Sequence, residues 1–298
     1  MTTDFAGSLV AIVTPMQRDG AVDFAAWARL IDWHIESGTS GIVVGGTTGE
    51  SATLTEAELR ELTQRACAQV AGRIAVVAGA GTSSTASTVE RVRWLSQLPI
   101  DALLIVTPAY NKPSQEGLFR HFAAAADASA VPVILYNVPG RTSVDMLPAT
   151  VGRLSQLPRI VAVKEAVPQI ERVRALLAQC RAGFGVLSGD DATACEAVLE
   201  GARGVISVTA NVAPRLMAEM IAAARRGDAA RARELDGRLA RAHQALFVEA
   251  NPIPVKWALA RMGLTEGGIR LPLTELAGMY HVAVTEALCS AGVLESNR

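Results

Sequence analysis

Lysine is rare in this chain, and one of its three lysines stands where an amine could do chemistry. Lys164 ends an apolar run that begins at Ile160, and the acidic Glu165 follows it. An amine at the mouth of an apolar interior is partly desolvated, which favours its neutral, nucleophilic form. Taken alone, such a residue is more often a strand-end lysine whose charged amine reaches water. The residues predicted to lie around Lys164 therefore determine whether it is a nucleophile.

The phenol of Tyr136 is the second candidate group, because it ends the preceding apolar run. Adjacent strands lie about 4.8 Å apart, so phenol and amine can share one pocket and exchange a proton through a substrate. Side chains alternate along a strand, which predicts Ala162 and Lys164 inward and Glu165 outward, away from the amine. The alternative for Tyr136 is a core residue whose hydroxyl bonds the backbone.

The segment Gly46–Glu50 reads Gly-Thr-Thr-Gly-Glu and predicts a seat for a small anion, most naturally a carboxylate. Thr47 and Thr48 offer two hydroxyls, and successive backbone N–H groups of such a turn point at an anion. No Gly-Lys-Ser/Thr follows the turn, so it is not a nucleotide phosphate loop. Arg141 could hold a second carboxylate through two parallel hydrogen bonds, although a surface arginine is the plain alternative.

Metal-assisted chemistry finds no support in the sequence. The histidines form no HExxH motif and no cluster, and Asp190-Asp191 is typical of a turn or a helix cap. We therefore predict no metal and a Schiff base on Lys164. Of the other two lysines, Lys112 is expected in a solvated loop and Lys256 within an amphipathic helix.

Short β-branched runs alternate with longer amphipathic stretches eight times, which predicts an α/β fold, a (β/α)8 TIM barrel. The strand candidates are Leu9–Thr14, Gly41–Val44, Ile74–Gly79, Ala102–Thr107, Val133–Asn137, Ile160–Glu165, Gly185–Gly189 and Gly204–Val208. Helical patterns include Asp23–Ser37, Thr55–Val70, Ser84–Leu98, Gln115–Ala130 and Ile170–Cys180. A doubly wound open sheet is the rival, but it would usually carry a glycine-rich phosphate loop after the first strand.

The pattern becomes purely helical after about Gly227. The predicted helices there are Asp228–Leu246, Pro254–Met262 and Pro272–Ala291. We predict a barrel over residues 1–227 and, over residues 228–298, a C-terminal helical extension that packs on the barrel. In such barrels functional groups gather at the C-terminal ends of the strands, where Lys164 and Tyr136 are expected.

The composition narrows the class of partner and the compartment. A net charge of −1 gives no electrostatic footprint for nucleic acid or for an anionic membrane. No apolar stretch approaches the roughly 18 residues of a membrane span, and the first residues lack the positive segment of a signal peptide. The four cysteines are dispersed, which predicts free thiols in a reducing, cytoplasmic environment.

Several motifs lie at the predicted strand ends and together are highly specific. They are VGGTTGES (44–51), TPAYNKPS (107–114), YNVPGRT (136–142), VKEA (163–166) and LSGDD (187–191). With them the chain resembles the 4-hydroxy-tetrahydrodipicolinate synthase (dihydrodipicolinate synthase) family of the pyruvate-dependent class I aldolase and N-acetylneuraminate lyase superfamily. The resemblance runs from Gly7 through NPIPVK (251–256) to near the end of the chain.

The resemblance implies a lyase that condenses pyruvate with L-aspartate 4-semialdehyde to 4-hydroxy-tetrahydrodipicolinate in diaminopimelate and lysine biosynthesis. Lys164 would carry pyruvate as a covalent imine without a cofactor, and Arg141 would bind the carboxylate of the semialdehyde. Family members are usually homotetramers built as dimers of dimers.

The same resemblance implies roles for further residues. Tyr136, Thr47 and a Tyr110 supplied by a neighbouring subunit would form the proton relay. Thr48 and the Thr47 backbone would seat the pyruvate carboxylate, with Gly189 and the carbonyl of Ile206 nearby.

One departure from the family pattern concerns feedback inhibition by lysine. Several polar side chains of the family's lysine-binding cleft are replaced, at Glu56, Leu59, Ser83, Ser87 and Ala109. Without the ammonium-binding glutamate and the stacking tyrosine, we predict weak or absent inhibition.

Two alternatives remain open. The first is another pyruvate-dependent aldolase, either N-acetylneuraminate lyase or a 2-keto-3-deoxy sugar-acid aldolase, although Arg141 favours a short acidic aldehyde. The second is a non-catalytic barrel that binds a keto acid. Borohydride trapping with pyruvate, followed by assays of turnover, separates these possibilities.

Overall fold

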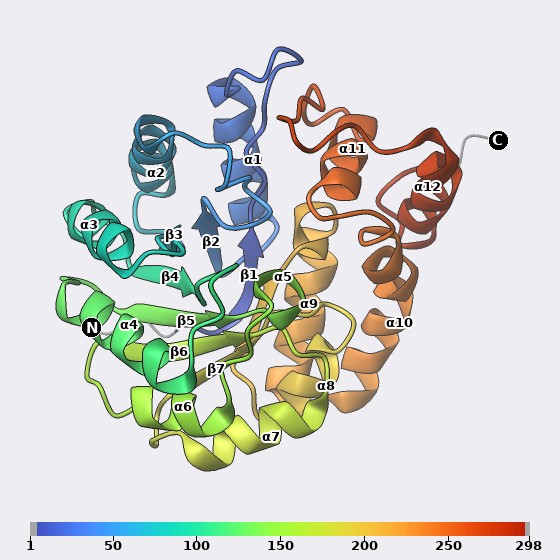
Figure 1. The fold of residues 1–298 in the computed structure, drawn as a ribbon. Coiled ribbons are helices and arrows are strands. Elements are labelled where there is room, and N and C mark those ends of the chain that lie inside the picture. Colours follow the sequence, from blue (N-terminus) through green and yellow to red (C-terminus); the bar gives the residue numbers. More distant parts are fainter. Residues whose placement is uncertain (1–4, 296–298) are drawn as a thin grey trace.

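The computed structural model describes residues 5–295 and contains a closed barrel of eight parallel strands in chain order (Figure 1). The strands are β1 (Gly7–Ala11), β2 (Gly41–Val44), β3 (Ala75–Gly79), β4 (Ala102–Val106), β5 (Val133–Asn137), β6 (Ile160–Glu165), β7 (Gly185–Ser188) and β8 (Gly204–Ser207). β1 pairs with both β2 and β8, which closes the cylinder. The predicted (β/α)8 barrel is confirmed.

Helices surround the strands in Figure 1. They are α1 (Phe24–Glu36), α2 (Glu56–Val70), α3 (Thr85–Leu95), α4 (Gln115–Asp127), α5 (Pro139–Thr142), α6 (Pro148–Leu154), α7 (Ile170–Gln179), α8 (Ala194–Leu199) and α9 (Pro214–Arg225). The strands are apolar throughout because both of their faces are covered. One face packs under the helices, and the other fills the barrel with side chains such as Leu9, Val43, Ile134 and Ala162.

The first strand is shorter at its C-terminal end than the sequence predicts. β1 ends at Ala11, not at Thr14, because the chain leaves the ladder to bond other partners. The Val13 N–H donates to the side chain of Asn211 (3.0 Å), and the Thr14 hydroxyl donates to the Gly49 carbonyl (2.7 Å). The end of β1 is thereby tied to the loop that carries the predicted anion seat.

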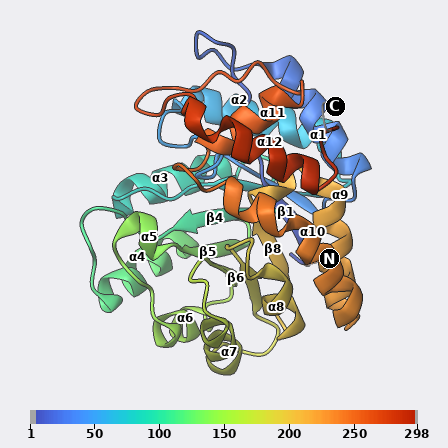
Figure 2. The ribbon, with the colours of Figure 1, turned by 90° about the vertical axis from the view of Figure 1, so that its right-hand side faces the viewer.

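The C-terminal extension consists of α10 (Ala229–Ala245), α11 (Ile253–Arg261) and α12 (His281–Ser290). Figures 1 and 2 show α10 beside α9, with α12 on its other side. Leu235, Leu239 and Leu288 of the extension belong to the same apolar core as the barrel helices. Barrel and extension thus share one core, and the boundary between residues 227 and 228 stays a prediction.

The predicted helix Pro272–Ala291 is wrong in its first third. A short 3-10 turn covers Gly278–Tyr280, and the helix begins only at His281. Between positions 272 and 277 only Leu276 is buried, so this stretch has no apolar face that a helix could pack against the core. Instead it forms a loop beside α11.

Within residues 5–295, no helix combines the length and the apolar character needed to cross a bilayer.

Candidate active site

Lys164 and Tyr136 meet inside the mouth of the barrel. Tyr136 on β5 is in register with Lys164 on β6, and both side chains point inward as alternation predicts. Only 5% of Lys164 and 7% of Tyr136 is exposed. The Nζ atom of Lys164 lies 4.3 Å from the centre of the Tyr136 ring. The amine and the phenol therefore share one site.

A pocket of about 140 Å³ opens above these two side chains. Its wall includes four of the residues predicted for binding or catalysis: Thr47, Thr48, Arg141 and Gly189. Phe247 and Asn251 also line it, and both come from the C-terminal extension. The pocket is small and polar enough for a short keto acid held close to the amine.

Glu165 points away from the amine, as predicted. Its carboxylate is buried outside the barrel, where it accepts hydrogen bonds from the Asn137 side-chain amide (3.1 Å) and the Val167 N–H (2.9 Å). Arg172 lies 3.9 Å away. Burial raises the pKa of Glu165 to about 7, although the two hydrogen bonds and Arg172 oppose this shift. Asn137 and Glu165 directly follow Tyr136 and Lys164 in their strands, so this network fixes the ends of β5 and β6.

The turn after β2 has the features of a carboxylate seat. Among residues 5–295, no hydrogen bond occupies the backbone N–H groups of Thr47 and Thr48. The Thr48 hydroxyl accepts a hydrogen bond from the side-chain amide of Asn251 (2.9 Å), which leaves its own proton free to donate to an anion. Two backbone donors and one hydroxyl donor are thus available on one side of the pocket.

Arg141 stands at the rim of the pocket, on the short helix α5. Its guanidinium donates to the Asn251 carbonyl (3.0 Å), and the residue is otherwise exposed. The remaining N–H groups of the guanidinium can bind a carboxylate that enters from solvent.

Gly189 forms the wall beside the catalytic candidate. A Cβ atom at this position would lie 3.0 Å from Cε and 3.1 Å from Cγ of Lys164, and 3.0 Å from the Cβ of Ala166. An added side chain here would therefore press on the lysine stem, which passes close to the backbone.

Two predicted residues are outside this pocket. Tyr110 is 94% exposed and adopts a positive φ of 74° in the loop after β4. Ile206 is buried within the barrel interior, below the residues that line the pocket. The chain by itself therefore does not bring Tyr110 to Lys164, and the expected contribution from a neighbouring subunit stays a prediction. Among residues 5–295, no group of three or more His, Cys, Asp or Glu side chains is arranged to hold a metal ion.

The sequence profile described as the dihydrodipicolinate synthetase family matches residues 4–291. The chain belongs to the dihydrodipicolinate synthetase family. Its family resemblance therefore extends over the barrel and most of the C-terminal extension.

Individual relatives agree with this assignment. A 4-hydroxy-tetrahydrodipicolinate synthase of Methylococcus capsulatus is 56% identical over 288 residues, which cover 97% of this chain and 99% of the relative. A chloride-inhibited dihydrodipicolinate synthase of Acinetobacter baumannii, solved in complex with pyruvate, matches with a TM-score of 0.96 and 47% identity over 98% of this chain and 100% of the other. A dihydrodipicolinate synthase variant described as monomeric matches with a TM-score of 0.95 and 39% identity, over 97% and 98% of the two chains.

No local pattern in the sequence predicts that Phe247 and Asn251 line the pocket. Asn251 begins the NPIPVK segment (251–256), whose only signal is the family resemblance. Its asparagine bonds Thr48 and Arg141 at once, from 203 and 110 positions away along the chain. These contacts form only because the C-terminal extension packs on the barrel, so they can be seen only in the structure.

Proposed function

We propose that this chain condenses pyruvate with L-aspartate 4-semialdehyde to give 4-hydroxy-tetrahydrodipicolinate, a step of diaminopimelate and lysine biosynthesis. The observation that carries the proposal is the buried Lys164 amine, 4.3 Å from the Tyr136 ring centre, in a small pocket with a carboxylate seat. The activities named for the relatives have the same chemistry.

The first stage is imine formation. The lone pair of Lys164 Nζ attacks the keto carbon of pyruvate, and the resulting carbinolamine loses water to give the imine. Tyr136 lies beside Nζ and would carry the protons that the amine loses and the departing hydroxyl gains. During this stage, the carboxylate of pyruvate would be held by the Thr48 hydroxyl and by the backbone N–H groups of Thr47 and Thr48. No external cofactor is needed, since the imine itself withdraws the electrons.

The second stage makes the new carbon–carbon bond. The imine loses a proton from the former methyl group and becomes an enamine, whose terminal carbon attacks the aldehyde carbon of the second substrate. The aldehyde oxygen takes up a proton and becomes the hydroxyl of the product. The amino group of the semialdehyde then attacks the imine carbon, closes the ring and releases Lys164.

The pocket favours this second substrate over longer ones. Arg141 at the rim supplies a bidentate partner for the carboxylate of a short acidic aldehyde. The pocket of about 140 Å³ beside Lys164 suits a short substrate. Gly189 keeps the wall beside Lys164 open, and the carbonyl of Ile206 is retained as a further proposed contact for pyruvate.

We further propose that the chain works as a homotetramer, a dimer of dimers in which Tyr110 completes the neighbouring subunit's pocket. In support, Tyr110 is a large aromatic that is 94% exposed within its own chain and is held in a positive-φ conformation. Such a side chain is typical of a residue that binds a partner. A monomeric variant exists among the similar structures, so the assembly needs a direct test.

The proposed location is the cytoplasm, because the four cysteines are free thiols in the structure.

Weak or absent inhibition by lysine also stays a prediction. Glu56, at one of the replaced positions, is ion-paired with Arg91 across α2 and α3.

The test of the proposed reaction is a steady-state assay with pyruvate and L-aspartate 4-semialdehyde, run beside an assay with sialic acid and one with a 2-keto-3-deoxy sugar acid. We expect turnover only with the first pair of substrates, and its loss in Lys164→Ala. Cleavage of sialic acid without any condensation activity would reject the proposal in favour of the lyase alternative.

A further inference from the structure

A second lysine amine is buried in the molecule, and the proposed reaction does not use it. Lys256 of α11 is 2% exposed, although it was expected only on an amphipathic helix. Its amine forms an ion pair and hydrogen bond with Glu50, which is 4% exposed. Lysine and glutamate are almost never buried without a partner, and removal of either member of a buried pair leaves an uncompensated charge.

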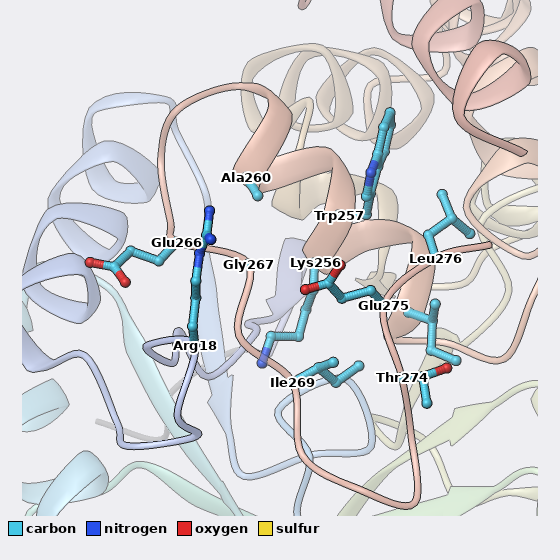
Figure 3. A pocket seen from close by; sticks show the side chains of 11 residues that line it. Arg18, Lys256, Trp257, Ala260, Glu266, Gly267, Ile269, Thr274, Glu275 and Leu276 are labelled. Carbon is cyan, nitrogen blue, oxygen red and sulfur yellow. The ribbon is translucent and has the colours of Figure 1, made fainter. Parts of the chain in front are cut away.

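Figure 3 shows how Lys256 reaches its partner. The side chain leaves α11 and runs past Ile269, so that its stem lines a cavity of about 150 Å³ between α11 and the loop that follows. The amine lies at the end remote from Trp257 and Glu275. The lysine thus extends from the helical extension toward the turn after β2.

Glu50 ends the turn that offers the carboxylate seat, and its backbone is strained. Its φ of 57° lies in the left-handed region, which is unfavourable for a residue with a side chain. Both carboxylate oxygens are held by the C-terminal extension. Lys256 binds Oε1, and the backbone N–H of Arg270 donates to Oε2 (3.2 Å). These contacts hold the backbone in a conformation that it would otherwise leave.

The strained residue is linked directly to the seat. The Glu50 N–H donates to the Thr47 carbonyl (3.1 Å), so that the position of Glu50 sets the orientation of the Thr47–Thr48 peptide. Asn251, on the same extension, donates a hydrogen bond to the Thr48 hydroxyl (2.9 Å). The extension therefore holds the turn at two residues, Thr48 and Glu50.

We propose that the Lys256–Glu50 pair positions the pyruvate seat: it holds the turn so that the Thr47 and Thr48 donors face the carboxylate of the keto acid. Lys256 and Glu50 are positioning residues and touch no substrate. This inference rests on the proposed function for the identity of the ligand. It predicts that loss of the pair weakens pyruvate binding more than it affects the second substrate.

Three variants separate positioning from stability. Lys256→Met leaves a buried carboxylate without its cation, and Glu50→Gln leaves a buried amine without its anion. Burial lowers the pKa of Lys256 below its ordinary value, and the Glu50 carboxylate opposes this shift. The double variant Glu50→Gln/Lys256→Met removes both charges and should recover much of the thermal stability that either single change loses. Arg241→Met is the matched control, since it breaks an exposed ion pair with Glu286 between α10 and α12.

Each variant is titrated with pyruvate, and the Lys164 imine is trapped with borohydride and counted by intact-protein mass. We expect the half-saturating pyruvate concentration to rise at least about tenfold in Lys256→Met and in the double variant, while the KM for the aldehyde changes less than about twofold. The control should match the wild type. A double variant that regains both its melting temperature and its half-saturation for pyruvate would overturn the inference, because the pair would then be only structural. If Lys256→Met does not fold, the double variant alone decides the question.

The trapping titration does not require the aldehyde. It therefore tests the role of the Lys256–Glu50 pair independently of the proposed condensation reaction. A wild-type chain that traps pyruvate on Lys164 but forms no product with the aldehyde contradicts the proposed reaction, and the titration still tests the pair. Normal product formation together with unchanged pyruvate half-saturation in every variant contradicts only the role of the pair.

Discussion

Gly189 is the residue at which a single added methyl group tests the geometry of the site. In Gly189→Ala the new Cβ would press against Cγ and Cε of Lys164 at about 3 Å. Relief of this contact requires the lysine stem to move, and displacement of a reacting atom is costly for catalysis. We expect kcat to fall at least about tenfold in a steady-state assay, with the fold intact by circular dichroism.

Gly237→Ala is the matched control for this change, because nothing lies within 4 Å of its added Cβ in the middle of α10. It should leave kcat unchanged and stabilise the protein by up to about 1 kcal/mol, as alanine favours a helix over glycine. Wild-type kcat in Gly189→Ala would show that the lysine has room that the structure does not indicate.

Glu165 gives a prediction about pH. Burial raises its pKa to about 7 in the folded state from the ordinary value of 4.5. The folded protein therefore binds this proton more tightly than the unfolded chain does. The resulting stabilisation is fully present below pH 4.5 and is lost as the pH rises through 7, a change of about 3 kcal/mol.

Glu165→Gln removes this titration. Subtracting the variant's free energy of unfolding from that of the wild type, measured by urea titration across this pH range, should leave a difference that falls with rising pH. Glu171→Gln, on the exposed face of α7, is measured in parallel as a surface control. A flat difference for Glu165→Gln would mean that the Glu165 carboxylate is ionised throughout and is better paired than its burial indicates.

At the scale of elements, helix α2 begins directly after the turn that carries the carboxylate seat. Thr55 and Glu58 form a reciprocal capping box: the Glu58 N–H donates to the Thr55 hydroxyl (3.2 Å), and the Thr55 N–H donates to the Glu58 carboxylate (2.9 Å). Thr55→Ala should lower the free energy of unfolding by about 1 kcal/mol, whereas Thr55→Ser should retain the cap. Equal stability of both variants in urea titrations would show that the cap contributes nothing.

The strands and this helix start could be predicted because their signals are local. β-branched runs buried on both faces give continuous apolar segments, and the capping box depends on residues only three positions apart. The helix proposed from Pro272 failed because its first residues offer no apolar face. Only Leu276 is buried between positions 272 and 277, so a helix there would have nothing to pack against the core.

At the scale of the whole molecule, the barrel explains why the sequence predicted the proposed catalytic pair, Lys164 and Tyr136, but not the residues of the extension that hold the turn after β2. Lys164 and Tyr136 end adjacent strands, so that the closure of the barrel must bring them together. Asn251 precedes α11 and Lys256 lies on it, and no strand register determines how this segment docks. Their partners Thr48 and Glu50 are more than 200 positions away in the chain. Such contacts leave no periodic signal in a single sequence.

The proposed assembly can be tested by mixing subunits. Lys164→Ala and Tyr110→Phe are each expected to have little activity alone. If Tyr110 acts in the neighbouring pocket, a hybrid dimer holds one intact site, and random exchange of equal amounts should restore about a quarter of wild-type activity. Light scattering should report a tetramer. A mixture no more active than the mean of its components would place Tyr110 outside the partner's site.

The central claim is that the Lys164 amine condenses with a ketone, and borohydride reduction with pyruvate tests it most directly. The protein is incubated with pyruvate, reduced, digested and mapped by mass spectrometry, with Lys164→Ala treated in parallel. We predict one reduced pyruvate adduct per chain, on the peptide that contains Lys164, and none in the variant. An unmodified Lys164, or an adduct on Lys112 or Lys256 instead, would contradict the account.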